Sequence, residues 1–154
     1  MTTIAEAVWP RDREEVARLM RDYAASLDID LGFQDFAAEV AGLPGSYARP
    51  DGVMLIAWAE GEMAGIVAYR RHERASCEMK RLYVRPGFRG SGLGRRLCEA
   101  LIADARAHGY RRMLLDTVAS MAAARRLYEA LGFRPIPPYY DNPLPGAAYL
   151  ALDF

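Results

Sequence analysis

One glycine-rich stretch, residues 84–96, constrains the fold more than any other part of the chain. It reads VRPGFRGSGLGRR, so an apolar strand pattern stops at a proline, passes through four glycines and continues as a helical pattern. Glycine allows tight turns and leaves backbone N–H groups open to a ligand. The helix that follows adds unpaired N–H groups and the positive end of its dipole. We therefore expect a strand, an anion-binding loop and a helix in succession.

Two common phosphate-binding loops do not fit this stretch. A P-loop requires a lysine where Leu93 stands, and a dinucleotide fingerprint requires a glycine where Arg95 stands. The pattern that remains is Arg89-x-x-Gly92-x-Gly94. It resembles the pyrophosphate-binding pattern of the GNAT superfamily of N-acetyltransferases. The resemblance implies that acetyl-CoA is the co-substrate.

Length and charge limit the remaining classes of protein. The chain has 154 residues, which predicts one domain spanning 1–154. Twenty basic and twenty acidic side chains give a net charge of zero, so charge gives no reason to expect a nucleic-acid or membrane partner. We expect a cytoplasmic protein, because no basic leader and no apolar run of about 18 residues is found. Cys77 and Cys98 lack metal-ligand spacing, so we expect reduced core thiols and no metal.

The order of sequence patterns predicts an α/β fold of the α+β type, β-αα-βββ-α-β-α-ββ. The central sheet is expected to be mixed but mostly antiparallel and twisted, with about seven strands and about four flanking helices. The expected strands are 3–8, 53–59, 63–69, 77–84, 112–118, 133–136 and 147–152. A capping box of Asp12 and Glu15 begins the first helix, the second covers 33–41, the third follows the glycine loop and Ser120 caps the fourth. This is the order that the resemblance implies, over nearly the whole chain.

The resemblance also implies where the coenzyme binds. Its pantetheine arm would lie along the strand backbone at Leu82, Tyr83 and Val84. Its pyrophosphate would take N–H groups from the loop, and Arg95 could add a charge-assisted bond. The implied loop contacts are Arg89, Gly90, Ser91, Gly92, Leu93, Gly94 and Arg95. One position departs from the pattern, since Met121 stands where many relatives carry an asparagine.

Tyr128 is the candidate general acid. It lies in the segment ARRLYEALGF, residues 124–133, which matches the superfamily's A-x-x-L-Y-x-x-x-G-F helix. In that superfamily the tyrosine protonates the departing thiolate. A phenol with a pKa of about 10 can donate a proton while staying neutral at pH 7. The other interpretation is that the Tyr128 ring packs on the sheet.

Glu78 is the candidate base that deprotonates the acceptor amine. The resemblance places it where the histone-acetylating branch has its glutamate base, acting through a water. A water chain alone is an alternative. Glu78 could also form a salt bridge with Lys80, because residues i and i+2 of a strand share a face. Asp116, on the next strand, is a weaker candidate for the base.

A proline-rich segment, residues 137–143, is expected to border the acceptor pocket. Its residues Tyr139, Tyr140 and Asn142 could shape the pocket, and an aromatic wall or carboxylate clamp could come from Trp58, Tyr69, Arg70 and Arg81. The expected function is direct transfer of acetyl from acetyl-CoA to a primary amine of a small molecule such as an amino acid or polyamine. A protein lysine or N-terminal amine is an alternative acceptor. A non-catalytic acyl-CoA-binding sensor is the other alternative, and the resemblance also allows a homodimer.

Overall fold

A seven-stranded sheet forms the centre of the molecule, in the order β1-β2-β3-β4-β5-β7-β6. The computed structural model describes residues 1–27, 31–32 and 35–154. Its strands are β1 (Thr2–Glu6), β2 (Val53–Ala59), β3 (Glu62–Glu73), β4 (Ser76–Val84), β5 (Arg112–Thr117), β6 (Arg134–Pro135) and β7 (Ala148–Asp153). The α-helices of the described residues are α1 (Arg13–Leu27), α2 (Phe36–Ala41), α3 (Leu93–Ala107) and α4 (Ala122–Ala130). The predicted fold class and element order are confirmed.

Helix starts are where the structure departs from the sequence prediction. The predicted start of α2 at Phe33 lies outside the described residues, and the observed helix begins at Phe36. Asp12 accepts the Val8 N–H at 2.8 Å, so its carboxylate fixes the turn before α1, while Glu15 pairs with Arg18 instead of completing a capping box. Helix α4 begins two residues after the predicted cap, behind a short 3₁₀ turn over Ala119–Met121.

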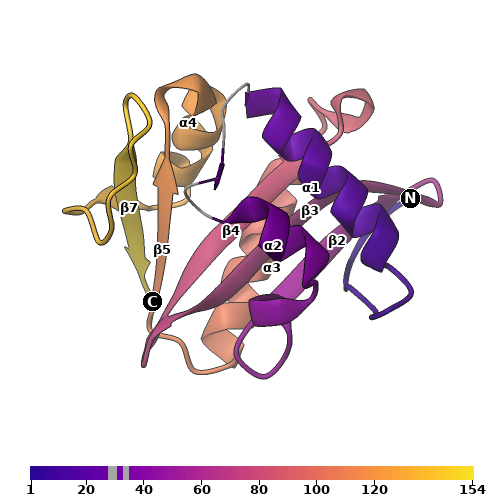
Figure 1. Cartoon of the computed structure of the whole chain (residues 1–154), viewed down its shortest axis with the longest axis horizontal. Helices are drawn as coiled ribbons and strands as arrows, with labels where there is room; N and C mark the ends of the chain where they lie inside the picture. Colours follow the sequence, from indigo (N-terminus) through magenta and orange to yellow (C-terminus); the bar gives the residue numbers. More distant parts are fainter. Residues whose placement is uncertain (28–30, 33–34) are drawn as a thin grey trace.

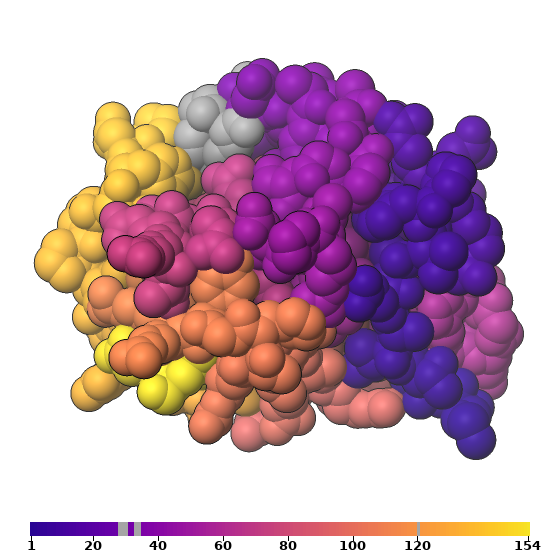
Figure 2. All heavy atoms as spheres, turned by 90° about the horizontal axis from the view of Figure 1, so that it is seen from below, coloured from indigo at the N-terminus to yellow at the C-terminus, as the bar shows by residue number. Residues whose placement is uncertain are grey.

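Strand alternation gives the sheet two apolar faces with a core on each. One face packs against α3 and α4 through residues such as Leu55, Met79 and Leu97. The other packs against α1 and α2 through residues such as Ile56 and Met20. In Figure 1, α1 and α2 lie in front of the sheet and α3 behind it. Figure 2 shows the N-terminal part of the chain (indigo) and the C-terminal part (yellow) at opposite ends of the face seen from below.

The sheet divides along the boundary between β4 and β5. These strands pair in parallel only where residues 76–78 face residues 112–114. Beyond that point β4 stays paired with β3 as far as Val84, and β5 stays paired with β7 as far as Thr117. The two halves of the sheet therefore diverge, and a gap opens between β4 and β5 (Figure 1).

A β-bulge lies on β4 beside this gap. Ile66 pairs with Tyr83 but Ala68 pairs with Lys80, so two residues of β4 stand opposite one residue of β3. Within the bulge Arg81 has φ of 64°, a left-handed conformation that is uncommon for a residue other than glycine. As a result, consecutive side chains no longer alternate, and Lys80 and Arg81 both lie on the α1 and α2 face.

Arg49 ties three elements together on the opposite face. Its guanidinium pairs with Glu6 of β1 at 2.9 Å and with Asp104 of α3 at 2.5 Å. The Tyr69 hydroxyl of β3 also donates to Asp104, at 2.5 Å. Burial would raise the pKa of Asp104, but the hydrogen bonds from Arg49 and Tyr69 outweigh it and hold the pKa below its usual value. Tyr69 is therefore part of a structural clamp on the α3 face, and its predicted place in the acceptor wall is wrong.

We predict that Asp104→Asn lowers the free energy of unfolding by about 1–3 kcal/mol at pH 7, because a charge-assisted bond becomes a neutral one. The folded pKa of Asp104 is depressed, so its contribution is present above the unfolded pKa of about 3.9 and disappears as the pH falls through the folded pKa. Urea unfolding of both proteins between pH 7 and pH 3 should show the difference shrinking at the acid end.

The matched control is Asp51→Asn, because Asp51 pairs with Arg71 at 3.1 Å and both side chains are largely exposed. This change should alter the free energy of unfolding by no more than about 0.5 kcal/mol. The clamp would be contradicted if the two substitutions changed the free energy of unfolding equally. It would also be contradicted if the loss of unfolding free energy in Asp104→Asn did not depend on pH.

Candidate active site

A cleft of about 420 Å³ lies between the end of β4, the glycine loop, α4 and the end of α1. It brings together the residues predicted to bind the coenzyme, with the exception of Ser91, whose Oγ donates to the Phe88 carbonyl at 3.0 Å. The predicted residues that line the cleft are Leu82, Tyr83, Val84, Arg89, Gly90, Gly92, Leu93, Gly94 and Arg95. Met121, at the start of α4, also lines it. We call this the donor cleft.

The glycine loop has the geometry of an anion site. Gly90 and Gly92 have φ of 85° and 78°, which side chains rarely tolerate. The first residue of α3 is Leu93, and the Arg96 N–H donates to the Gly92 carbonyl at 3.1 Å. The N–H groups before Arg96 therefore have no acceptor within the helix. They stand at the positive end of a 15-residue helix, where a pyrophosphate is favoured.

Arg89 and Arg95 of the loop differ in the partners that their side chains bind within the protein. Arg89 donates through Nε to the Val84 carbonyl at 2.8 Å, which holds the loop against the end of β4. Arg95 pairs with Glu99 at 3.4 Å, and both side chains are about half exposed. Such exposed pairs are worth little, so Arg95 can exchange this partner for a phosphate.

Tyr128 lies in a narrow cavity in the gap between β4 and β5. This cavity shares Leu82 and Met121 with the donor cleft, so the two adjoin. The Tyr128 ring is 5% exposed and packs on Phe133 at a centroid distance of 5.8 Å. Burial raises the pKa of Tyr128 well above its ordinary value, with smaller contributions from Cys98, Tyr23 and Asp116, so the hydroxyl stays protonated at neutral pH. The Tyr128 ring therefore packs in the core, as the second interpretation expects, and it also lines the cavity, while its role as general acid stays a prediction.

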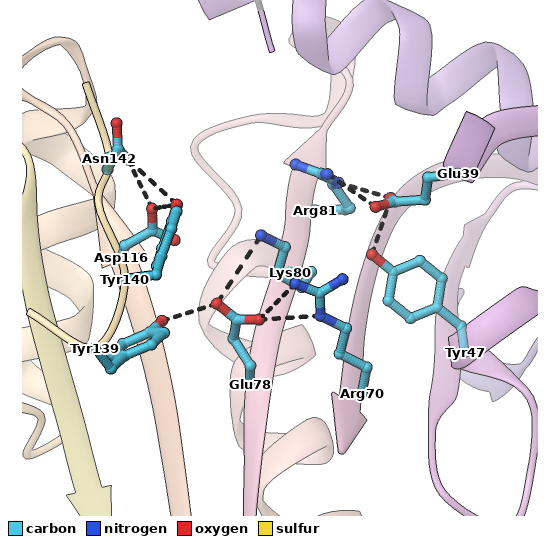
Figure 3. Close-up of polar contacts among 10 residues, drawn as sticks. All are labelled: Glu39, Tyr47, Arg70, Glu78, Lys80, Arg81, Asp116, Tyr139, Tyr140 and Asn142. Carbon is cyan, nitrogen blue, oxygen red and sulfur yellow. Dashed lines mark hydrogen bonds and ion pairs between the residues drawn. The ribbon is translucent and has the colours of Figure 1, made fainter. Parts of the chain in front are cut away.

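A third cavity, of about 310 Å³, lies beside the Tyr128 cavity and shares Lys80 with it. Glu78 is 3% exposed and stands on its wall. The Glu78 Oε1 atom accepts from Arg70 Nε at 3.0 Å, and its Oε2 atom accepts from the Tyr139 hydroxyl at 2.8 Å and lies 4.0 Å from Lys80 Nζ (Figure 3). Glu78 thus forms the expected contact with Lys80 and a closer one with Arg70. We call this the acceptor cavity.

The proline-rich loop after β6 covers this region. Its Asn142 Nδ2 atom donates to Asp116 Oδ2 at 2.7 Å, and the Tyr140 hydroxyl donates to the same oxygen (Figure 3). The Tyr149 hydroxyl of β7 donates to the Tyr140 carbonyl at 2.6 Å. The pKa of Tyr139 is raised by its burial and by the nearby Glu78 carboxylate. The predicted loop residues therefore meet both carboxylates, Glu78 and Asp116.

The residues that line the acceptor cavity differ in part from those predicted for its wall. Trp58 packs with the core under α1 and is no part of the acceptor wall, whereas Arg70 lines the cavity as expected. Arg81 binds Glu39 at 2.8 Å and borders the Tyr128 cavity. His72 lines the acceptor cavity and was missed. Its spacing of two residues from Arg70 is the signal that would have placed both on one face.

The two cysteines and the acidic groups give no sign of other chemistry. Cys77 and Cys98 are buried, and burial raises the pKa of each thiol to about 12, so neither is a ready nucleophile. Within the described part of the chain, no cluster of three or more His, Cys, Asp or Glu residues has the arrangement of a metal site. None of the helices described is long and apolar enough to cross a membrane.

Comparison with known proteins agrees with this geometry. The family model described as Acetyltransferase (GNAT) family matches residues 9–133. The chain belongs to the GNAT family of acetyltransferases. It is therefore an enzyme of the N-acetyltransferase type, and the GNAT family uses acetyl-CoA as co-substrate.

Three known proteins show how similar the chain is to others in sequence and in fold. An uncharacterized N-acetyltransferase of Schizosaccharomyces pombe is 38% identical over 98% of this chain and 94% of its own length. The N-acetylaspartate synthetase of Danio rerio is 34% identical over 80% of this chain, but only 45% of the synthetase is covered. A GNAT acetyltransferase structure from Staphylococcus aureus superposes with a TM-score of 0.82 at 18% identity, over 99% of both chains, which supports the fold.

We predict that Gly92→Val weakens binding of coenzyme A by about 10-fold to 100-fold. Valine at φ of 78° costs about 1–3 kcal/mol of backbone strain, and relief of this strain would move the N–H groups of the loop. Calorimetric titration with coenzyme A measures the change.

Gly87→Ala is the control, because Gly87 has no positive φ and a Cβ there meets nothing within 4 Å. Its affinity for coenzyme A should equal that of the unaltered protein. Undiminished binding by the Gly92→Val protein would show that the pyrophosphate lies elsewhere.

Proposed function

We propose that this enzyme transfers acetyl from acetyl-CoA directly to the primary amine of a small molecule that carries a carboxylate, with an amino acid as the simplest case. The observation that carries the proposal is the acceptor cavity. It adjoins the Tyr128 cavity, has a volume of about 310 Å³ and is lined by two basic side chains, Arg70 and Lys80. Its volume lies at the lower end of the range for small-molecule sites.

Arg70 favours a carboxylate on the acceptor. A guanidinium has five N–H donors, and Glu78 engages Arg70 through Nε and Nη2. The remaining donors are available on the cavity wall, where a second carboxylate can form charge-assisted bonds. A polyamine would bring further positive charge next to Arg70 and Lys80, which opposes its binding.

The similarity to N-acetylaspartate synthetases supports the same acceptor class. That name describes the acetylation of an amino acid with a second carboxylate. The chain matches less than half of the Danio rerio protein, 45%, so the name guides the choice of acceptor and does not fix it. L-Aspartate is accordingly the first acceptor to test.

The proposal gives each reacting group a place in the cavities. The donor's pyrophosphate binds the N–H groups at the start of α3, and its pantetheine arm follows β4 from Val84 toward Leu82, so the thioester lies beside Tyr128. The acceptor's ammonium loses one proton before it attacks. The nitrogen lone pair forms the new C–N bond, the C–S bond breaks, and the thiolate takes the Tyr128 proton. The phenolate regains the proton that leaves the amide nitrogen, so one proton is released overall.

Free thiol release from acetyl-CoA tests the proposal. The panel comprises L-aspartate, glycine, glycinamide, spermidine and a lysine-containing peptide. We expect kcat/KM to be about 10-fold to 100-fold higher for glycine than for glycinamide, because a charge-assisted bond to the carboxylate is worth about 1.5–3 kcal/mol. L-Aspartate should also exceed spermidine and the peptide.

Tyr128→Phe tests the general acid. This variant should lower kcat about 10²-fold or more without changing the affinity for coenzyme A. Tyr110→Phe is the matched control, because the Tyr110 hydroxyl donates to the Asp51 carbonyl away from these cavities, and its loss should affect stability only. Faster acetylation of the peptide or spermidine would favour those acceptors. Coenzyme binding without turnover of any amine would favour the sensor class instead.

A further inference from the structure

We propose that Asp116, through Oδ1, accepts the proton of the acceptor ammonium, and that Lys80 opposite it holds the acceptor carboxylate. This inference rests on the proposed function and deepens it. It assigns the base and the orientation of an amino acid in the gap between β4 and β5. Glu78 then serves to hold Arg70 in place, and Arg70 is left to bind the second carboxylate of an acceptor such as L-aspartate, while Lys80 binds the carboxylate next to the amine.

Glu78 has little capacity left to act as a base. Its Oε1 atom accepts the Arg70 Nε–H at 3.0 Å and lies 3.0 Å from Arg70 Nη2. Its Oε2 atom accepts the Tyr139 hydroxyl at 2.8 Å and faces Lys80 at 4.0 Å (Figure 3). Both oxygens are therefore engaged, one of them by a guanidinium. Glu78 lines the acceptor cavity and is no part of the wall of the Tyr128 cavity.

Asp116 differs from Glu78 in two ways. Its two hydrogen bonds, from Tyr140 and Asn142, both go to Oδ2 (Figure 3). Among the residues that the structure describes, no hydrogen bond is made to Oδ1. Both donors on Oδ2 are neutral, and within the described part of the chain no arginine pairs with this carboxylate. Asp116 also lines the same cavity as Tyr128, which places it near the thioester end of the donor cleft.

Lys80 is the cation that faces this carboxylate across the gap. Its side chain is 4% exposed, and the bulge at Arg81 places both basic residues on the same face. Arg81 is committed to Glu39, with bonds of 2.8 and 2.9 Å. Lys80 lines both the Tyr128 cavity and the acceptor cavity. Burial lowers the pKa of Lys80, with Glu78 and Asp116 opposing the shift, so a bound carboxylate would stabilise its charged form.

An amino acid matches this arrangement of charges. With its carboxylate on Lys80, its ammonium points across the gap to Asp116. The ammonium gives one proton to Asp116 Oδ1, which becomes a neutral carboxylic acid, and the freed lone pair attacks the thioester carbon. Asp116 later releases that proton to solvent as the single proton that the reaction produces. The remaining protons move as described for Tyr128, so no further reactant is required.

Several charged and titratable groups surround Asp116. Lys80 of β4 lines the same cavity, and the Tyr140 and Asn142 donors of the loop bind Oδ2. The titratable neighbours among the described residues include Tyr23 of α1, Tyr128 of α4 and Tyr139 of the loop, and desolvation raises the pKa of each phenol. These phenols are neutral at pH 7 and do not change charge near neutrality.

The pH profile of Asp116→Asn tests the base, with the best acceptor of the thiol-release panel as probe. At pH 7 we expect kcat/KM about 10²-fold below the unaltered enzyme. Without this base, the variant can use only acceptor molecules whose amine is already neutral. Its kcat/KM should therefore rise about tenfold per pH unit up to the pKa of the amine, and its difference in kcat/KM from the unaltered enzyme should shrink as the pH rises. Glu78→Gln should keep the pH profile of the unaltered enzyme. The affinity for coenzyme A, measured in parallel, reports an intact fold.

Two further variants keep the test decisive. Asp116→Ala with added formate should regain activity in proportion to formate, a rescue that a structural role would not give. Lys80→Met should reduce the preference for glycine over glycinamide to near one, because methionine keeps the length and removes the charge.

The outcomes separate the two claims. If the unaltered enzyme acetylates no amine, the proposed function fails and this inference fails with it. If it acetylates an amino acid but Asp116→Asn keeps the unaltered pH profile, or Asp116→Ala shows no rescue, the inference alone is overturned. A preference for glycine that survives Lys80→Met would overturn the assigned orientation.

Discussion

The early end of pairing between β4 and β5 is the constraint on which the rest of the site depends. The strands share hydrogen bonds only from Ser76 to Glu78 on β4, and each then follows its outer neighbour. The cavity that Tyr128 lines lies where the two halves of the sheet diverge. The acceptor cavity shares Lys80 with it, so in the proposed function the two substrates meet where the sheet divides.

Buried charge is organised around that gap. Arg81 is neutralised by Glu39 and Glu78 by Arg70, so both pairs are nearly complete within the protein. Buried ion pairs recover little net stability after desolvation, and they are better understood here as fixing geometry. Lys80 and Asp116 line the same cavity. In the orientation that we propose, a zwitterionic acceptor lies between them.

Local sequence patterns predicted the element order, the glycine loop and the Tyr128 helix, because glycine spacing and helical periodicity act within a few residues. They missed the bulge, since a left-handed Arg81 depends on how β4 pairs with β3 on either side of it and on Glu39, 42 residues away. They also misplaced Tyr69, whose side chain lies on the α3 face because of strand register. The bond from Tyr139 to the candidate base Glu78 spans 61 residues and had no local signal.

The most direct test of the shared gap is a crystal structure with a bisubstrate conjugate, in which an acetyl bridge joins the sulfur of coenzyme A to the nitrogen of an amino acid. We predict the pyrophosphate at the start of α3, the sulfur against the Tyr128 hydroxyl and the amino acid nitrogen beside Asp116, between β4 and β5. A conjugate whose sulfur lies outside the gap, away from Tyr128, would contradict it.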